Sequence, residues 1–222
     1  MASELEPALR FLEELERNHE PTLATIRSHA FVTSVAEGNA PLDVLRSFAV
    51  AEYWYMRGGV SHFALSILNS PDLETQRFFH ERLSGELEYL SRFRPFMEAV
   101  GLTDSEAAQQ TPRPEALNAV NYLFRLSVEG GPAEKAVAWY LVGRVFSDTC
   151  SAMREGLAEH YGIAGEALNY FDIPHVRSER FVNAVARLVT IYGLDQGRKD
   201  ELEQVAAHIL AYEKDFYDSM LQ

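Results

Sequence analysis

The sequence predicts an all-α protein, a bundle of seven to eight helices formed by a single domain that spans residues 1–222. Apolar residues recur at helical spacing in nearly every segment, and no segment alternates apolar and polar residues between hairpin turns as strands do. Hydrophobic residues make up 47% of the 222 positions, which is enough to bury a sizeable core. No linker rich in glycine, serine or proline divides the chain.

Proline, glycine and capping residues indicate where each helix begins and ends. We expect one short helix before residue 175 and longer helices over residues 4–18, 21–37, 41–68, 72–100, 115–128, 132–161, 175–192 and 195–220. The polar segment 103–114 contains two prolines, so we expect a loop there that can include one helical turn. Gly58 and Gly59, in the middle of the third long helix, indicate a kink or close packing against a neighbour.

Charge and cysteine content argue against several classes of function. The net charge of −13 disfavours binding to nucleic acid or to an anionic membrane surface, because both require clustered lysine and arginine. Cys150 is the only cysteine, so no disulfide can form within the chain. The acidic N-terminus lacks an apolar signal core, and no apolar run is long enough to span a bilayer. We therefore expect a cytoplasmic protein that acts on a small molecule.

The stretch 168–182 contains the clearest chemical signal. His175 and Glu179 are four residues apart, so in a helix they would share one face, and that face is largely apolar. Burying an imidazole and a carboxylate is costly unless something pairs with them, which favours a functional site. The alternative, given equal weight, is a surface glutamate at a helix start beside a histidine that only packs.

Three other acids fall on apolar faces of predicted helices. Glu52 shares a face with Tyr55, and an acid and a phenol there could hold and protonate a substrate; alternatively, Glu52 reaches solvent. Glu86 and Glu213 each align with apolar residues of their own helices. We predict that Glu52, Tyr55 and Glu213 are catalytic residues that line one central cavity together with His175.

A metal site is a second prediction from these acids. An inward Glu86 beside His175 and Glu179 would combine carboxylate and imidazole donors, a set that suits non-haem iron. We predict these three residues as ligands of one weakly held Fe(II). In the alternative, metal-free site, His175 acts as general acid or base and Glu179 sets its tautomer.

Arg144 is the only charge in the central part of the helix predicted over 132–161, and it could bind a substrate carboxylate. We predict it as a substrate-binding residue together with Trp54, Tyr170 and Tyr212. Cys150 follows in the same helix and is predicted to be a small buried residue, not a nucleophile. No Ser-His-Asp arrangement, glycine-rich phosphate loop or paired-cysteine zinc motif is visible.

Several short motifs, in their order along the chain, resemble those of one known superfamily. The segments 29–38, 70–79, 96–102, 154–163 and 212–216 are similar to motifs of the haem-oxygenase-like proteins. The resemblance covers residues 29–220 and points to the branch that holds thiaminase II, the pyrroloquinoline-quinone synthase C component and the di-iron oxidases of this fold. It implies the haem-oxygenase-like bundle and the homodimers that are common among its members.

The resemblance to the di-iron oxidases is partial. Glu86, His175 and Glu179 fall at or near three of their six ligand positions, whereas Phe93 and Val182 occupy two of the others. We therefore expect no stable di-iron centre and at most a single iron.

The resemblance to thiaminase II is also partial. Glu52 and Glu213 match its acids, but the position of its thiol falls nearer Val142 than Cys150. Glu213 also replaces a C-terminal lysine of the quinone synthase, which argues against that reaction.

These observations favour a biosynthetic or tailoring enzyme, specifically an oxidase that acts on a small substrate in a central pocket with at most a degenerate iron site. An iron-dependent oxidoreductase, or one like the quinone synthase C component, is preferred to a hydrolase. Two alternatives stay open. One is a thiaminase II-like hydrolase of a heterocycle that uses Glu52 and Glu213, and the other is a non-catalytic binding protein that kept the fold.

Overall fold

The computed structural model describes residues 2–222, apart from the side chains of Ala2, Ser3, Pro174 and His175. Over this part the backbone forms ten α-helices and no strand, which confirms the predicted all-α class. The α-helices are α1 (Ala2–Asn18), α2 (Glu20–Arg27), α3 (Ala30–Ala36), α4 (Leu42–Leu68), α5 (Leu73–Ala99), α6 (Asp104–Gln109), α7 (Asn118–Glu129), α8 (Pro132–Tyr161), α9 (Glu179–Tyr192) and α10 (Gln196–Asp218). Four 3-10 helices join them, η1 (Pro114–Leu117), η2 (Gly165–Phe171), η3 (Pro174–Arg177) and η4 (Ser219–Leu221).

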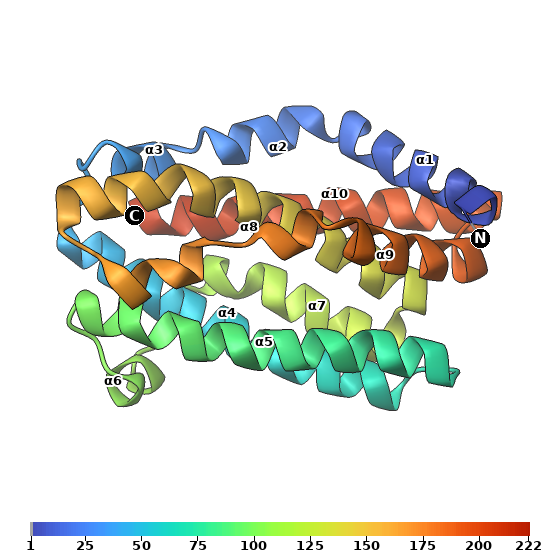
Figure 1. Cartoon of the computed structure of the whole chain (residues 1–222), viewed down its shortest axis with the longest axis horizontal. Coiled ribbons are helices and arrows are strands. Elements are labelled where there is room, and N and C mark those ends of the chain that lie inside the picture. The colour runs from blue at the N-terminus through green and yellow to red at the C-terminus, as the bar shows by residue number, and fades with distance from the viewer. Residues whose placement is uncertain (1) are drawn as a thin grey trace.

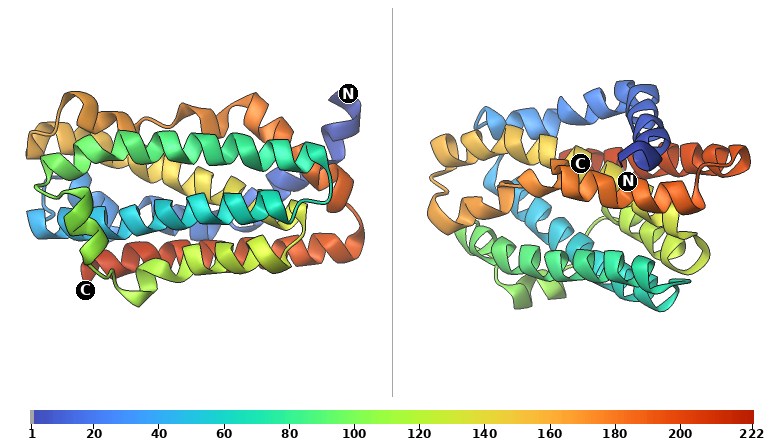
Figure 2. Two further views of the ribbon diagram at one scale, coloured as in Figure 1. Left: turned by 90° about the horizontal axis from the view of Figure 1, so that it is seen from below. Right: turned by 45° about the vertical axis from the view of Figure 1, so that its right-hand side comes forward.

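The long helices run along the long axis of the molecule and enclose a common core (Figure 1). α4 packs against α5 on one side of the bundle, and α8 packs against both α9 and α10 in its middle. The three N-terminal helices cover the opposite side, where α1 contacts α9 and α3 contacts α8 (Figures 1 and 2). None of the helices in the described part of the chain combines the length and the apolar run that crossing a bilayer requires.

The predicted long helices over 72–100 and 132–161 are confirmed as α5 and α8. The region 21–37, predicted as one helix, is divided into α2 and α3. His29 is extended (ψ 142°) and its ring nitrogen accepts the N–H of Phe31, so it caps the start of α3. Within the polar segment 103–114, Thr103 and Glu106 form a capping box that starts α6.

The helix predicted to begin at His175 begins instead at Glu179. Ser178 has ψ 141°, and its hydroxyl accepts the N–H of Phe181, so Ser178 is the N-cap of α9. His175 belongs to the separate 3-10 helix η3. The prediction that His175 and Glu179 share one helical face is therefore wrong, because the backbone changes direction between them. The side chain of His175 lies outside the described residues.

Gly58 and Gly59 bring α4 close to two neighbours, as their position predicts. A Cβ at Gly58 would lie 2.0 Å from the side chain of Val120 in α7, and a Cβ at Gly59 would lie 2.7 Å from Oε1 of Glu86 in α5. Real Cβ atoms essentially never come within 3.0 Å of another atom. The hydrogen side chain at 59 therefore leaves room for a carboxyl group in the interior between α4 and α5.

Candidate active site

A cavity of about 100 Å³ lies inside the bundle, lined by residues of α4, α5, α8, α9 and α10 and by η2 and η3. Its walls are largely apolar, so the few polar groups that enter it decide its chemistry. Those that contribute oxygen atoms are glutamates and tyrosines, namely Glu52, Tyr55, Glu86, Tyr89, Tyr170, Glu213 and Tyr217. Among the described residues, Arg82 is the one basic side chain on the wall.

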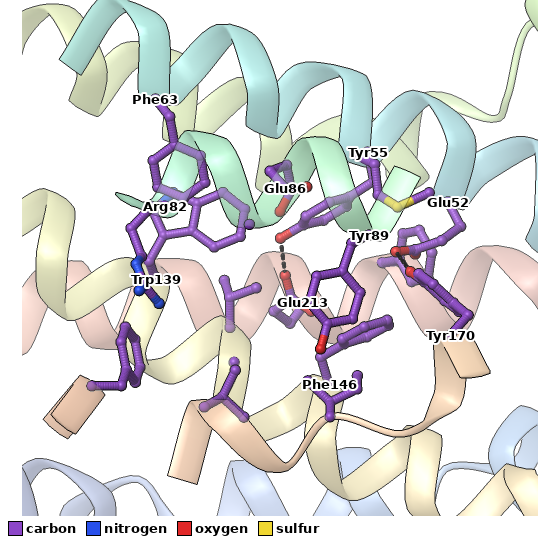
Figure 3. A pocket seen from close by; sticks show the side chains of 18 of the residues that line it. Glu52, Tyr55, Phe63, Arg82, Glu86, Tyr89, Trp139, Phe146, Tyr170 and Glu213 are labelled. Atoms are coloured by element: carbon purple, nitrogen blue, oxygen red, sulfur yellow. Dashed lines mark hydrogen bonds between the residues drawn. The ribbon is translucent and has the colours of Figure 1, made fainter. Parts of the chain in front are cut away.

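Three glutamates reach the cavity from three different helices, Glu52 from α4, Glu86 from α5 and Glu213 from α10 (Figure 3). Burial penalises the charged form of a carboxyl group. It raises the pKa of Glu52 to about 7 and that of Glu213 to about 8. Burial and, secondarily, the negative charge of Glu52 raise the pKa of Glu86 to about 8. Near neutral pH the cavity therefore contains both carboxylic acid and carboxylate, which general acid–base catalysis requires.

Tyrosine hydroxyls hold two of the three carboxyl groups in place. Tyr170 of η2 donates a hydrogen bond of 2.5 Å to Oε1 of Glu52, and Tyr55 of α4 donates one of 2.5 Å to Oε1 of Glu213 (Figure 3). Each bond favours the charged carboxylate and so opposes the effect of burial on the pKa of the acid. Burial raises the pKa of both tyrosines well above the ordinary value, so they remain hydrogen-bond donors.

Glu86 differs from the other two acids. It points into the cavity near Tyr55, and among the described residues no side chain or backbone group forms a hydrogen bond or ion pair with it (Figure 3). A carboxyl group that lines a cavity without an internal partner is free to bind a ligand.

Aromatic rings form the wall at the end of the cavity where Arg82 lies (Figure 3). The ring of Phe63 in α4 stacks on Trp139 in α8, with centroids 4.5 Å apart and planes at 29°. The guanidinium of Arg82 lies 5.0 Å from the centroid of Phe181 in α9. The flat surface of the Phe63–Trp139 pair suits a planar ring, since stacked aromatic contacts are favourable.

The structure brings Glu52, Tyr55, Tyr170 and Glu213 to this one cavity, where the sequence predicts a site. The predicted common cavity with His175 falls on a side chain outside the described residues. The catalytic and substrate-binding roles of these residues stay predictions.

The other three predicted substrate-binding residues lie away from the cavity. Trp54 donates its indole N–H to the backbone carbonyl of Gln110 at 2.9 Å, which fastens the end of α6 to α4. Arg144 forms two hydrogen bonds of 2.7 and 2.9 Å with Glu16 of α1, so its charge is already neutralised. Tyr212 packs its ring against α7.

Of the predicted iron ligands, Glu86 and Glu179 have different surroundings. Glu86 lines the cavity, whereas Glu179 is exposed in the first turn of α9 because that helix starts at Ser178. Within the described part of the chain, no three His, Cys, Asp or Glu side chains lie close enough to hold a metal ion. The side chain of His175, the third predicted ligand, lies outside the described residues, so the Fe(II) site stays a prediction and we derive no step through a metal.

Cys150 is fully buried and is absent from the cavity wall, which Val142 and Gly143 of the same helix line instead. Burial, and secondarily the charge of Glu52, raises the pKa of the thiol well above its ordinary value. A protonated, inaccessible thiol is a poor nucleophile. This placement supports the prediction that Cys150 has a packing role.

Sequence reasoning missed several residues of the cavity wall, among them Phe63, Arg82, Tyr89, Trp139 and Phe146. One signal could have identified two of them. Arg82 precedes Glu86 by four residues and Trp139 precedes Gly143 by four, so each shares a helical face with a cavity residue.

The fold and the cavity place the protein in one class, the helical bundles that bind a small molecule in an interior cavity with acidic side chains on its wall. The model of the TENA/THI-4/PQQC family matches residues 16–222, and the chain belongs to this family. Among curated proteins, the chain is similar to the aminopyrimidine aminohydrolase of Staphylococcus carnosus, with 31% identity over 84 residues. That match covers 36% of this chain and only 37% of the relative.

Solved structures confirm the haem-oxygenase-like fold. A TenA homologue from Pyrococcus furiosus superposes with a TM-score of 0.75 at 21% identity, over 95% of this chain and 99% of that one. A domain of unknown function with a heme oxygenase-like fold, from Shewanella denitrificans, gives a TM-score of 0.78 at 16% identity, over 95% and 91% of the two chains.

The comparisons correct the predicted reaction class. The sequence favours an oxidoreductase over a hydrolase, and this preference is wrong, because the curated relative is named as an aminohydrolase. The preference depended on the iron ligands, and Glu179 is exposed and is not among the residues that line the cavity with Glu86.

Proposed function

We propose that the protein is a hydrolase that replaces the exocyclic amino group of a small aromatic nitrogen heterocycle, of the aminopyrimidine class, with oxygen from water. The observation that carries this proposal is the pair of buried acids Glu52 and Glu213, each held by a tyrosine, in a cavity with a flat aromatic wall. The similarity to an aminopyrimidine aminohydrolase supports the same chemistry, although it spans 37% of that protein.

Glu52 and Glu213 can take different roles, one as the general base and the other as the general acid. Glu52 has the lower pKa of the two, about 7 against about 8 for Glu213, so Glu52 is the group that is more ionised near neutral pH. Repulsion between two buried carboxylates favours the state in which one of them keeps its proton. We assign Glu52 as the general base and Glu213 as the general acid.

In the first step, the carboxylate of Glu52 takes a proton from a water molecule as the water oxygen bonds to the carbon that carries the amino group. In a 4-aminopyrimidine the electron pair moves through the conjugated ring to the nitrogen opposite the attacked carbon, and that nitrogen takes the proton of Glu213. The product is a neutral tetrahedral intermediate, with Glu52 protonated and Glu213 ionised.

In the second step, Glu52 returns its proton to the amino group, the C–N bond breaks and ammonia leaves. The new hydroxyl gives its proton to Glu213 as the C=O bond forms. Both acids regain their starting states, and the net reaction consumes one water for each ammonia released. The two tyrosine hydrogen bonds hold the acids in position through both steps.

The cavity wall explains why we propose direct attack by water. In the described part of the chain, no thiol reaches the cavity. Val142, which the resemblance puts nearest the thiol position of thiaminase II, lines the cavity instead. The chain therefore departs from the thiol-dependent enzymes that it resembles.

Ammonia release from a panel of aminopyrimidines tests this proposal. The purified protein should release ammonia and form the corresponding hydroxypyrimidine, and Glu52→Gln and Glu213→Gln should each lower kcat by about a hundredfold or more. Glu129→Gln is the matched control, because Glu129 is exposed and pairs only with Arg125 on the surface of α7. Binding of the panel without ammonia release would contradict a hydrolase and support a binding protein.

A further inference from the structure

We propose that Glu86 recognises the edge of the heterocycle that carries the amino group, by two parallel hydrogen bonds to a ring nitrogen and the adjacent amine. This inference rests on the proposed function for its substrate class, and it assigns a binding role to a residue outside the acid–base pair Glu52 and Glu213.

The first supporting observation is that Glu86 has no internal partner. Tyr170 and Tyr55 donate to Glu52 and Glu213, but no described residue donates to the carboxyl group of Glu86. The side chain of Glu86 is half-buried on the cavity wall, so its unpaired carboxyl group is accessible to hydrogen bonds from a ligand.

The second observation is the position of Glu86 next to the aromatic wall. A Cβ at Gly59 would lie 2.7 Å from Oε1 of Glu86 and 3.2 Å from Cη2 of Trp139. The carboxyl group of Glu86 and the edge of the Trp139 indole ring therefore both lie close to Gly59. A planar ring that stacks on the Phe63–Trp139 pair therefore has Glu86 beside its edge.

The third observation is chemical complementarity. A protonated carboxyl group carries one donor and one acceptor side by side. The N=C–NH₂ edge of an aminopyrimidine presents one acceptor and one donor at the same spacing. The two groups can therefore pair through two hydrogen bonds, which fixes the orientation of the ring as a single bond would not.

The surroundings of Glu86 favour its protonated form. Burial and the charge of Glu52 raise its pKa to about 8. Among the described residues, the ionisable groups of the cavity wall around it are Glu52 and Tyr55 from α4, Glu213 and Tyr217 from α10, Tyr170 from η2, and Arg82 and Tyr89 from α5 itself. α8 contributes Trp139, Val142, Gly143 and Phe146 to the wall and no ionisable side chain. Arg82 is directed to Phe181 and to Glu81, 3.9 Å away, and forms no ion pair with Glu86.

Two isomeric probes test edge recognition without turnover. In 2-aminopyridine the amine is adjacent to the ring nitrogen, whereas in 3-aminopyridine it is not. Titration calorimetry should show that the unaltered protein binds 2-aminopyridine about tenfold more tightly, as expected for one added hydrogen bond. Glu86→Leu should abolish this preference. Glu86→Gln should keep it, because an amide also offers one acceptor and adjacent donors.

A second variant and a surface control complete the test. Gly59→Ala leaves the acid in the sequence but places a methyl group where its carboxyl lies, so it should lose the preference like Glu86→Leu. Glu88→Gln changes an exposed acid of the same helix, paired with Arg92, and should keep the preference.

Turnover of 4-aminopyrimidine separates this inference from the proposed function. Glu86→Leu should raise KM at least about tenfold, Glu86→Gln should restore it, and kcat should change less than KM. Lack of ammonia release by the unaltered protein overturns the proposed function, but the binding of the isomers still tests Glu86. An isomer preference that is absent from the unaltered protein, or that persists in Glu86→Leu, overturns the inference.

Discussion

The hydroxyl of Tyr55 and the carboxyl of Glu213 are joined by a hydrogen bond of 2.5 Å that connects α4 to α10 across the cavity. Burial is the main cause that raises the pKa of Glu213, the Tyr55 hydrogen bond lowers this pKa, and the charge of Glu52 raises it further. The protonation state of Glu213 therefore depends on Glu52 and Tyr55, which both belong to α4.

Tyr55→Phe removes this bond and should raise the pKa of Glu213 further, because the carboxylate loses a donor. If Glu213 is the general acid, the basic limb of the pH–rate profile should move to higher pH. kcat should fall by about tenfold or more because the acid loses its fixed position. A full pH profile of kcat measures both effects. An unchanged basic limb would exclude Glu213 as the acid that Tyr55 controls.

The three glutamates of the cavity also predict how stability depends on pH. In the folded protein the pKa values of Glu52, Glu86 and Glu213 are raised to about 7, 8 and 8, from 4.5 for an ordinary glutamate. The folded state therefore holds more protons than the unfolded state between these values. The free energy of unfolding should fall as pH rises through that window, by up to about 1.4 kcal/mol per pH unit for each acid, and level off above it.

Urea unfolding at pH 6 and pH 9 measures this dependence. The protein should be less stable at pH 9, and Glu213→Gln should show a smaller loss because an amide cannot ionise. Asp72 and Asp218, whose pKa values are lowered, lose their contribution only as pH falls, outside this window. Equal stability at the two pH values would show that the acids are not buried as described.

Cys150→Ala should leave turnover within about tenfold of the unaltered protein, because the thiol is buried behind the cavity wall. The variant should be less stable by about 1 kcal/mol, since it loses a packed sulfur atom. Steady-state kinetics on the variant, with circular dichroism to check folding, measure the effect. A loss of several orders of magnitude in a folded variant would identify Cys150 as a nucleophile.

Gly58→Ala should destabilise the fold by several kcal/mol, because its Cβ would lie 2.0 Å from the side chain of Val120. Gly85→Ala is the matched substitution in the next helix, where a Cβ meets nothing within 4 Å. It should stabilise the protein by up to about 1 kcal/mol, as alanine does in a helix interior. Thermal unfolding of the two variants compares them, and similar melting temperatures would show that α4 and α7 do not pack closely at Gly58.

The helices could be predicted because apolar periodicity and capping residues act locally. The division at His29 and the helix start at Ser178 were missed, since each depends on one extended residue inside an otherwise helical pattern. Glu52, Tyr55 and Glu213 could be assigned to one cavity from their inward faces. Trp54 was misplaced because it is adjacent to Tyr55, and one residue rotates a side chain by about 100° around a helix.

The surroundings of Glu86 illustrate a feature of the site that helical periodicity cannot predict. Its inward face was predictable, but its neighbours were not, because Gly59 and Trp139 come from other helices and tertiary packing decides which residues meet. Homodimer formation and a cytoplasmic location stay predictions, and light scattering on the purified protein would test the first.

Isotope labelling of the oxygen transferred to the product tests the central claim most directly. The protein is incubated with 4-aminopyrimidine in ¹⁸O-enriched water, and mass spectrometry of the product is combined with an ammonia assay. Direct hydrolysis predicts one ¹⁸O atom in the hydroxypyrimidine and one ammonia per product molecule, with both signals lost in Glu52→Gln. A product without ¹⁸O, or full activity in Glu52→Gln, would contradict the account.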